Sequence, residues 1–259
     1  LNPEFPMLKT MHVIFLMLLI PGVLPAQEPA SASGKLWQKG ELLAKEDFSS
    51  GLGDWQAEGD ITARIEDGRL RFEATTLTDI KKGNIWLKKD FTGPVLIEYD
   101  YQSATIHGLS MVWWNTQGRG GEDLFSFERS GAYIEYVKGK MNGYHISYHR
   151  FSTGLSNLRK SYGFHLLSSE TDPVQAEDLK VHHIVIYCQG GHIRFEVDGR
   201  VVHDYIDKGQ PCIGNSDWVH ETPCQGTGPA LTKGKLGLRH TQKQVAYYDN
   251  FKVYRLVEP

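Results

Sequence analysis

A run of seven residues gathers side chains that can transfer protons and bind a carboxylate. It begins at Tyr144 and reads Tyr-His-Ile-Ser-Tyr-His-Arg. Histidine titrates near neutrality, so His145 and His149 can accept or donate a proton. Tyr144 and Tyr148 can each protonate a leaving oxygen, and Arg150 can hold a carboxylate through two parallel hydrogen bonds. We therefore predict that these five residues are catalytic.

The direction of these side chains depends on how the segment folds. On a regular strand His145, Ser147 and His149 point to one face, while Tyr148 and Arg150 point to the other. Three polar groups on one face favour a solvent-filled binding groove. A solvent-exposed sheet face without a function would have the same pattern and is the alternative. Tyr148 and His149 cannot both face a groove unless a bulge intervenes.

The reaction that fits this set is β-elimination of a uronate polysaccharide. That reaction needs a group that neutralises the carboxylate, a base for the proton at C5 and an acid for the bridging oxygen. Arg159 joins Arg150 as a predicted carboxylate ligand. The other predicted substrate contacts are Gln102, His107, Trp114, Ser147 and Asn157.

Two adjacent tryptophans offer a flat ring for a sugar. Trp113 and Trp114 must point to opposite faces of a regular strand, so one can lie in the core while the other stacks on a ligand. Because Ser110 and Trp114 share a face, we expect Trp114 in the groove. Burial of both rings in a two-layer sandwich is the alternative.

Hydrolysis is the second enzymatic hypothesis, and it requires two carboxyl groups within about 10 Å. Glu122 and Glu128 share a face if their segment is a strand, but they would lie about 20 Å apart. Glu98 and Asp100 are closer in sequence. The pattern favours a lyase ahead of a hydrolase.

The elements that must position these residues are strands. Apolar and polar residues alternate over 94–102 and 192–197, and the continuous apolar run 181–188 is joined to the second of these by Gln-Gly-Gly. Many short strands separated by turn residues predict an all-β fold, a two-sheet antiparallel β-sandwich. The less regular stretch 157–171 is expected to be a loop that wraps the sheet edge.

The N-terminal residues predict export. We predict that residues 1–26 are a secretory signal peptide, because basic residues precede a short apolar run and a small residue ends the segment at the expected cleavage site. Residues 1–6 are expected to lie upstream of a start at Met7. A buried N-terminal helix is the alternative. Residues 27–39 then form a linker and 40–259 one domain, in a secreted or periplasmic protein without a further membrane span.

The net charge and the cysteine content limit the kinds of ligand and cofactor that we expect. The net charge of −3 argues against a nucleic-acid binder, which carries a basic face. Cys212 and Cys224 bracket a loop-like stretch and are predicted to form a disulfide, while Cys188 ends an apolar strand and is expected to be a buried free thiol. The sequence contains no zinc-spaced cysteine pairs and no phosphate-binding loop, so the predicted chemistry requires no cofactor.

Several motifs resemble a known family. Gly53-Asp54-Trp55, Phe195-Glu196-Val197-Asp198-Gly199 and Asp249-Asn250-Phe251 are similar to the concanavalin A-like lectin/glucanase superfamily of β-jelly rolls. Within it, the segments 144–150 and 157–166 resemble the YesU-like family of unknown function, associated with breakdown of pectin-type polysaccharides. The resemblance implies two curved sheets with a carbohydrate groove on the concave side. It also implies a structural calcium ion, for which Glu46 and Asp249 are the candidate ligands.

These observations lead to one hypothesis and two rivals. We expect a secreted carbohydrate-active protein that cleaves an extracellular, acidic, pectin-like polysaccharide or oligosaccharide. The first rival is a lectin-like module of the same fold that binds sugar without cleaving it, because fold alone does not assign chemistry. The second is a structural adhesion module whose aromatic residues all lie in the core.

Overall fold

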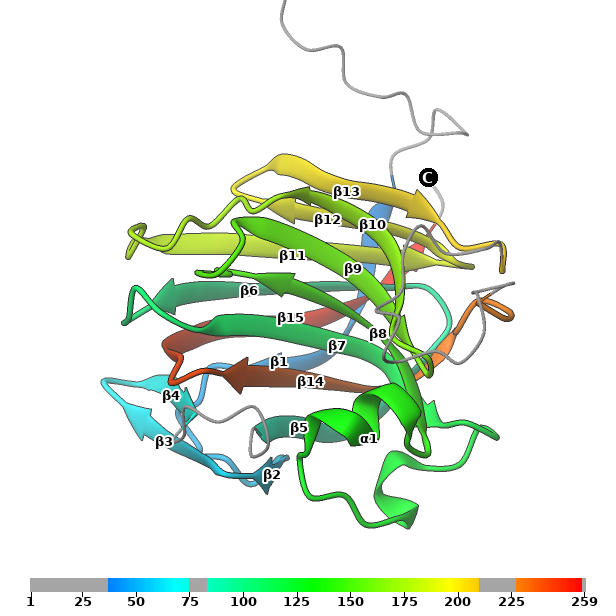
Figure 1. The fold of residues 1–259 in the computed structure, drawn as a ribbon, viewed down its shortest axis with the longest axis horizontal. Helices are drawn as coiled ribbons and strands as arrows, with labels where there is room; N and C mark the ends of the chain where they lie inside the picture. The colour runs from blue at the N-terminus through cyan, green and yellow to red at the C-terminus, as the bar shows by residue number, and fades with distance from the viewer. Residues whose placement is uncertain (1–36, 75–82, 210–226, 258–259) are drawn as a thin grey trace, which may run out of the picture. The chain divides into compact units, whose positions relative to one another are not determined.

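Two antiparallel sheets packed face to face make up the described part of the chain (Figure 1). The computed structural model describes residues 37–74, 83–209 and 227–257. The predicted all-β sandwich is confirmed: within these residues the helical elements are η1 (Leu124–Ser126) and α1 (Tyr133–Lys138), and the rest of the regular structure is strand.

The first sheet has the strand order β13-β12-β11-β6-β15-β4-β3, with β1 also paired to β15. Its strands are β1 (Gln38–Glu46), β3 (Ile61–Glu66), β4 (Arg69–Ala74), β6 (Val95–Ser103), β11 (Val181–Gln189), β12 (His192–Val197), β13 (Arg200–Ile206) and β15 (Val245–Val257). The expected hairpin at Gln189-Gly190-Gly191 is the β11–β12 connection.

The second sheet has the order β10-β9-β8-β7-β14-β5-β2. Its strands are β2 (Trp55–Gly59), β5 (Gly83–Thr92), β7 (Leu109–Gly118), β8 (Met141–Tyr148), β9 (Leu155–Ser161), β10 (His165–Thr171) and β14 (Lys233–Thr241). The segment between β7 and β8, residues 119–140, contains both helical elements; we call it the β7–β8 insertion. It lies in front of β5 in Figure 1.

The stretch 157–171, expected as a loop, is instead most of the β9–β10 hairpin. Polar residues on the core-facing side concealed its period of two. Ser156 and Lys160 are both buried on either side of Leu158. Lys160 is tolerated there because its ammonium forms a 2.7 Å ion pair with buried Asp207 and donates to two backbone carbonyls.

The main core fills the space between the sheets. Alternation along β8 sends Tyr144, Ile146 and Tyr148 into it, where they meet apolar and aromatic residues of β6 and β7. Trp114 stacks on Tyr144 at 5.7 Å between ring centroids. Removal of these rings from water is the main contribution to the stability of the sandwich.

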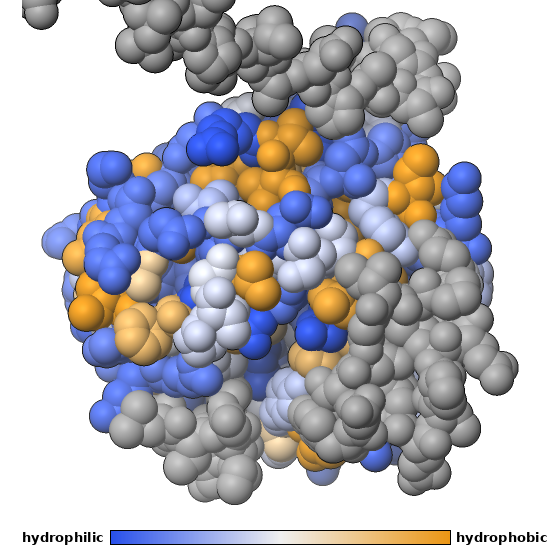
Figure 2. Space-filling view, turned by 45° about the horizontal axis from the view of Figure 1, so that its top comes forward, coloured by the Kyte–Doolittle hydropathy of each residue, from blue (hydrophilic) through white to orange (hydrophobic). Residues whose placement is uncertain are grey.

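The cysteine predictions fall on different parts of the chain. Cys188 is buried and free, as expected. Cys212 and Cys224 lie outside the described residues, so their disulfide stays a prediction. In the described part of the chain no helix has the length and apolar character needed to cross a membrane. Figure 2 shows one face, on which apolar residues form small groups separated by hydrophilic ones.

Buried histidines make the fold sensitive to acid. Burial lowers the pKa of His203 to about 4 and that of His240 to about 3, and it also lowers the pKa of His145 and His149. In the unfolded chain these rings titrate near 6.5. As the pH falls below that value, these histidines bind protons in the unfolded state but not in the folded state. The free energy of unfolding therefore decreases between about pH 6.5 and 4.

We therefore expect the free energy of unfolding to be lower at pH 5 than at pH 7. Replacing His203 by Gln, which can retain a hydrogen bond to Ser156 or Ser168, should reduce that difference by up to about 2 kcal/mol. Urea unfolding at both pH values measures it. The exposed His107→Gln is the control and should leave the difference unchanged; an unaltered difference in His203→Gln would contradict the assignment.

Candidate functional site

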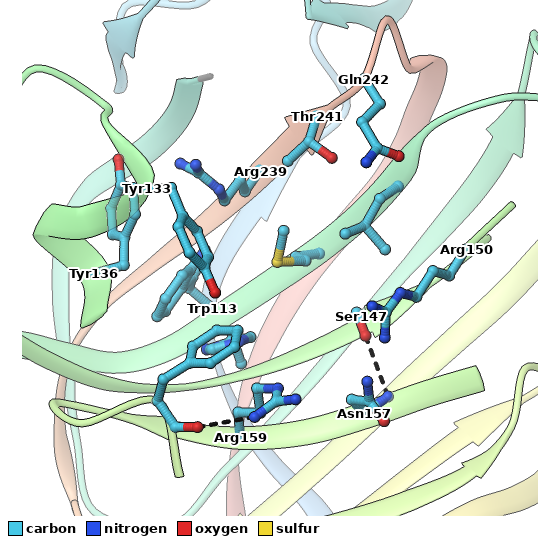
Figure 3. A pocket seen from close by; sticks show the side chains of 14 residues that line it. Trp113, Tyr133, Tyr136, Ser147, Arg150, Asn157, Arg159, Arg239, Thr241 and Gln242 are labelled. Carbon is cyan, nitrogen blue, oxygen red and sulfur yellow. Dashed lines mark hydrogen bonds between the residues drawn. The ribbon is translucent and has the colours of Figure 1, made fainter. Parts of the chain in front are cut away.

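A cavity of about 460 Å³ opens on the face of the second sheet that points away from the core (Figure 3). Four neighbouring strands, β14, β7, β8 and β9, supply its floor. The volume lies in the range of about 300–1,000 Å³ that is usual for small-molecule sites.

The strand register arranges the floor in rows that cross the strands. The first row contains Trp113, His145 and Arg159, which are paired neighbours on β7, β8 and β9. The second row contains Arg239, Met111, Ser147 and Asn157, and the third contains Thr241 and Leu109. Successive rows are two residues apart, so the first and third are separated by about 13 Å. These residues share a face because side chains alternate along each strand.

Aromatic rings from outside the floor cover the first row. Tyr133 and Tyr136 come from α1, and Phe164 comes from the turn between β9 and β10. Tyr136 packs against Trp113 at 5.5 Å and Tyr133 meets Phe164 edge-on at 5.3 Å. In Figure 3 Tyr133 lies directly beside Trp113. The first row is therefore enclosed by rings.

Three arginines give the cavity its charge. Arg150, Arg159 and Arg239 all line it, and no ion pair involving any of them is found in the described part of the chain. Arg159 donates to the carbonyl oxygen of Phe164 at 2.8 Å, and Arg239 lies over the Tyr136 ring at 4.1 Å. Burial lowers the pKa of Arg150 and brings that of Arg159 to about 10, still protonated at neutral pH.

His145 is the titratable base of the first row. Its ring packs against Trp113 at 4.2 Å, and its Nδ1 is buried without a hydrogen-bond partner. Burial, together with the charges of Arg159 and Arg239, holds its pKa well below the usual value. The imidazole is therefore neutral at pH 7, with one ring nitrogen able to accept a proton.

The backbone at His149 separates two predicted catalytic residues. β8 ends at Tyr148, and His149 adopts a left-handed conformation with φ of 50°. This turn buries the His149 ring away from the cavity, with Nε2 donating to the carbonyl oxygen of Thr105 at 2.9 Å. It also interrupts the alternation, so Arg150 lines the cavity on the same side as His145. The placement of His149 in a groove with His145 is wrong.

The two predicted catalytic tyrosines face the core, so neither can reach a ligand in the cavity. Tyr144 donates to Asp207 at 2.5 Å, and the Tyr148 hydroxyl lies 3.0 Å from that of Tyr99. Burial raises the pKa of both phenols. The phenols that do line the cavity, Tyr133 and Tyr136, come from the insertion, where the sequence pointed only to Glu122 and Glu128.

The preference for Trp114 over Trp113 is also wrong. Trp114 is buried in the main core, and Trp113 lines the cavity. Ser110, the residue used to orient the pair, faces the core and hydrogen-bonds Tyr101. Pairing with His145 would have been the better guide, because Trp113 lies directly opposite it.

Two predicted substrate contacts lie outside the cavity. Gln102 is on β6 of the other sheet, where it accepts a hydrogen bond from Arg69 at 2.8 Å. His107 is exposed in the loop before β7 and packs edge-on against Phe151 at 4.7 Å. Ser147, Asn157 and Arg159 do line the cavity, although Asn157 and Arg159 lie on strand β9 rather than in the expected loop, and their roles stay predictions.

The calcium prediction has no support in the described residues, which contain no group of three or more His, Cys, Asp or Glu side chains able to hold a metal. Glu46 instead accepts a hydrogen bond from Trp55 at 3.4 Å, and Asp249 accepts one from the backbone of Asn250.

The carboxylates considered for hydrolysis lie elsewhere as well. Glu98 and Asp100 are on the other sheet, in ion pairs with Lys39 and His183. Glu122 and Glu128 do not share a strand, because η1 lies between them. Within residues 37–74, 83–209 and 227–257, no Asp or Glu lines the cavity.

The two-sheet antiparallel sandwich is a jelly roll of the concanavalin and galectin type. A cavity of a size suited to a ligand lies on the outer face of one of its sheets. The chain belongs to the family described as Domain of unknown function (DUF1961), which it matches over residues 41–253. The expected YesU-like relationship is thereby confirmed.

Three similar proteins illustrate the relationship. An uncharacterized protein YesU of Bacillus subtilis is 29% identical over 221 residues, 80% of this chain and 92% of that protein. A crystal structure of a Bacillus subtilis protein of unknown function with a galectin-like fold has a TM-score of 0.74 at 27% identity, covering 86% of this chain and all of the other. A putative glycosyl hydrolase from Parabacteroides distasonis has a TM-score of 0.51 at 17% identity, covering 85% and 99%.

The arginine side chains that line the cavity without an ion pair should lower the free energy of unfolding. We expect Arg159→Met to leave the free energy of unfolding unchanged or to raise it by about 1 kcal/mol, since it removes a buried guanidinium without an acidic partner. The matched control is Arg129→Met. Arg129 is buried and ion-paired to Glu58 at 2.6 Å, so its loss should cost about 3–5 kcal/mol. Equal losses in chemical denaturation of both variants would contradict this account of the cavity.

Proposed function

We propose that the cavity binds an anionic saccharide through a uronate carboxylate. The observation that carries the proposal is that, among the described residues, the lining of one cavity contains three arginines and no Asp or Glu. An unpaired buried charge costs free energy, which an anionic ligand offsets. The planar guanidinium matches a carboxylate through two parallel hydrogen bonds.

The remaining lining suits a sugar better than a simple inorganic anion. Trp113 and Tyr133 supply flat apolar rings, while Ser147, Asn157 and Thr241 supply hydroxyl and amide groups. The similar fold of the Parabacteroides protein, described as a putative glycosyl hydrolase, adds support for a carbohydrate ligand. A pectin-type galacturonate is our preferred uronate.

For the reaction we propose β-elimination, using protein side chains alone. Arg150 and Arg159 hold the carboxylate and stabilise the negative charge that develops on it. Neutral His145 removes the proton at C5; the C4–O bond breaks as the C4–C5 double bond forms. The phenol of Tyr133, which interacts electrostatically with both arginines, protonates the leaving oxygen. A two-carboxylate hydrolysis has less support, since the lining contains no carboxylate.

Binding without cleavage is the second candidate. It is favoured by the burial of His145, whose side chain is 2% exposed and whose low pKa makes it a weak base. We further propose that the protein is exported, on the basis of the signal-like residues 1–26.

Binding is tested first, by titrating the protein with trigalacturonate in a calorimeter. We expect Arg150→Gln to weaken binding about tenfold to a hundredfold, because a hydrogen bond to a charged group is lost. The control is Arg119→Gln, which removes an exposed arginine that lies over Tyr162 outside the cavity. Equal affinity for maltotriose, which has no carboxylate, would contradict uronate recognition.

Cleavage is tested separately, by mass spectrometry of polygalacturonate incubated with the protein. β-Elimination yields products with an unsaturated end, whereas hydrolysis adds water. We expect His145→Gln and Tyr133→Phe each to lower the rate by a factor of about 10² or more while binding is retained. Intact polymer together with measurable trigalacturonate binding would leave the non-catalytic candidate as the function.

A further inference from the structure

The cavity is closed at the end that contains its first row. Tyr133 and Phe164 meet there ring to ring above Trp113 and His145, and Tyr136 continues the cover toward β5. We call Tyr133, Tyr136 and Phe164 the aromatic wall. Figure 3 shows Tyr133 and Tyr136 together at one end of the cavity, with Arg150 and Gln242 at the other.

The wall is held by a buried carboxylate rather than resting on the surface. Glu58 of β2 accepts hydrogen bonds from Tyr136 at 2.7 Å, from Trp86 at 3.0 Å and from Arg129 at 2.9 Å. The Glu58 and Arg129 side chains are only 7% and 6% exposed. Tyr136 and Arg129 of the insertion are thus bound to β2, the edge strand next to β5, and this fixes the position of Tyr136 in the wall.

An exposed aromatic platform lies next to Arg150, at the end of the cavity opposite the wall. Phe151 is 51% exposed and lines a second hollow, which shares Arg150 with the cavity and also contains Asp172 and Glu177. His107 supports the Phe151 ring edge-on at 4.7 Å. An exposed phenyl ring beside an unpaired guanidinium offers stacking and charge to the same ligand.

From these two ends we propose that the site recognises the terminus of a uronate saccharide chain. The terminal uronate lies against the aromatic wall, and the chain leaves past Arg150 with a following sugar stacked on Phe151. This inference rests on the proposed function and specifies its substrate as a chain end. A chain interior would have to continue through the wall, in which Glu58 holds Tyr136.

The number of protein molecules bound per chain tests this directly. Galacturonate oligosaccharides from the dimer to the dodecamer are titrated by calorimetry. A site for one terminus binds one protein per chain at every length, and affinity rises only until the Phe151 subsite is filled. A groove open at both ends binds chain interiors, so several proteins would assemble on the dodecamer.

A platform variant gives a second readout. Phe151→Ala should weaken tetragalacturonate binding about threefold to tenfold and leave binding of the monosaccharide within twofold. The control is Val181→Ala on β11 of the other sheet, an apolar side chain of similar exposure at 56%. It should change neither affinity.

The outcomes separate the two proposals. Stoichiometry that increases with chain length, or an unaltered length dependence in Phe151→Ala, overturns recognition of the chain end while uronate binding stands. No binding of any galacturonate oligosaccharide overturns both proposals. One protein per chain, combined with a selective loss for longer chains in Phe151→Ala, supports the inference.

Discussion

The buried carboxylate of Glu58 is the interaction on which the candidate site depends. It satisfies an indole, a phenol and a guanidinium at once, and a carboxylate so deeply placed is tolerable only because those donors replace its hydration. Without it α1 would lose its hydrogen bond to β2 and keep the one between Tyr136 and Asn84 of β5, and a helix of six residues has little stability of its own. The cover that Tyr136 gives to Arg239 would then be weakened, and charge recognition is weak in open solvent.

The fold was predictable because it follows from period-two alternation, and the same rule placed His145 and Ser147 on one face, which lines the cavity. It failed at two kinds of position. Lys160 faces the core because it forms an ion pair with Asp207, which lies 47 residues away, and no local sequence pattern predicts such a partner. At His149 a single left-handed residue interrupted the alternation, so Arg150 lines the cavity on the same side as His145, and the local pattern of apolar and polar residues does not mark this position.

The site itself was half predictable. His145 and Ser147 followed from sequence spacing, whereas Arg239 and Met111 lie on strands of the site but were not predicted. Tyr133 and Phe164 come from the insertion and a turn, whose paths are set by tertiary contacts. The choice between Trp113 and Trp114 needed the register between β7 and β8. Register depends on long-range pairing that alternation within one strand does not specify.

The division of β8 between two faces has an evolutionary consequence. Ile146 and its core-facing neighbours maintain the core between the sheets, while His145 and Ser147, one residue away, line the cavity. Substitutions on the outer face can therefore change the cavity and leave the core between the sheets intact. A scaffold of this kind can exchange one ligand for another by point mutation, so relatives that share the family are free to differ in what they bind.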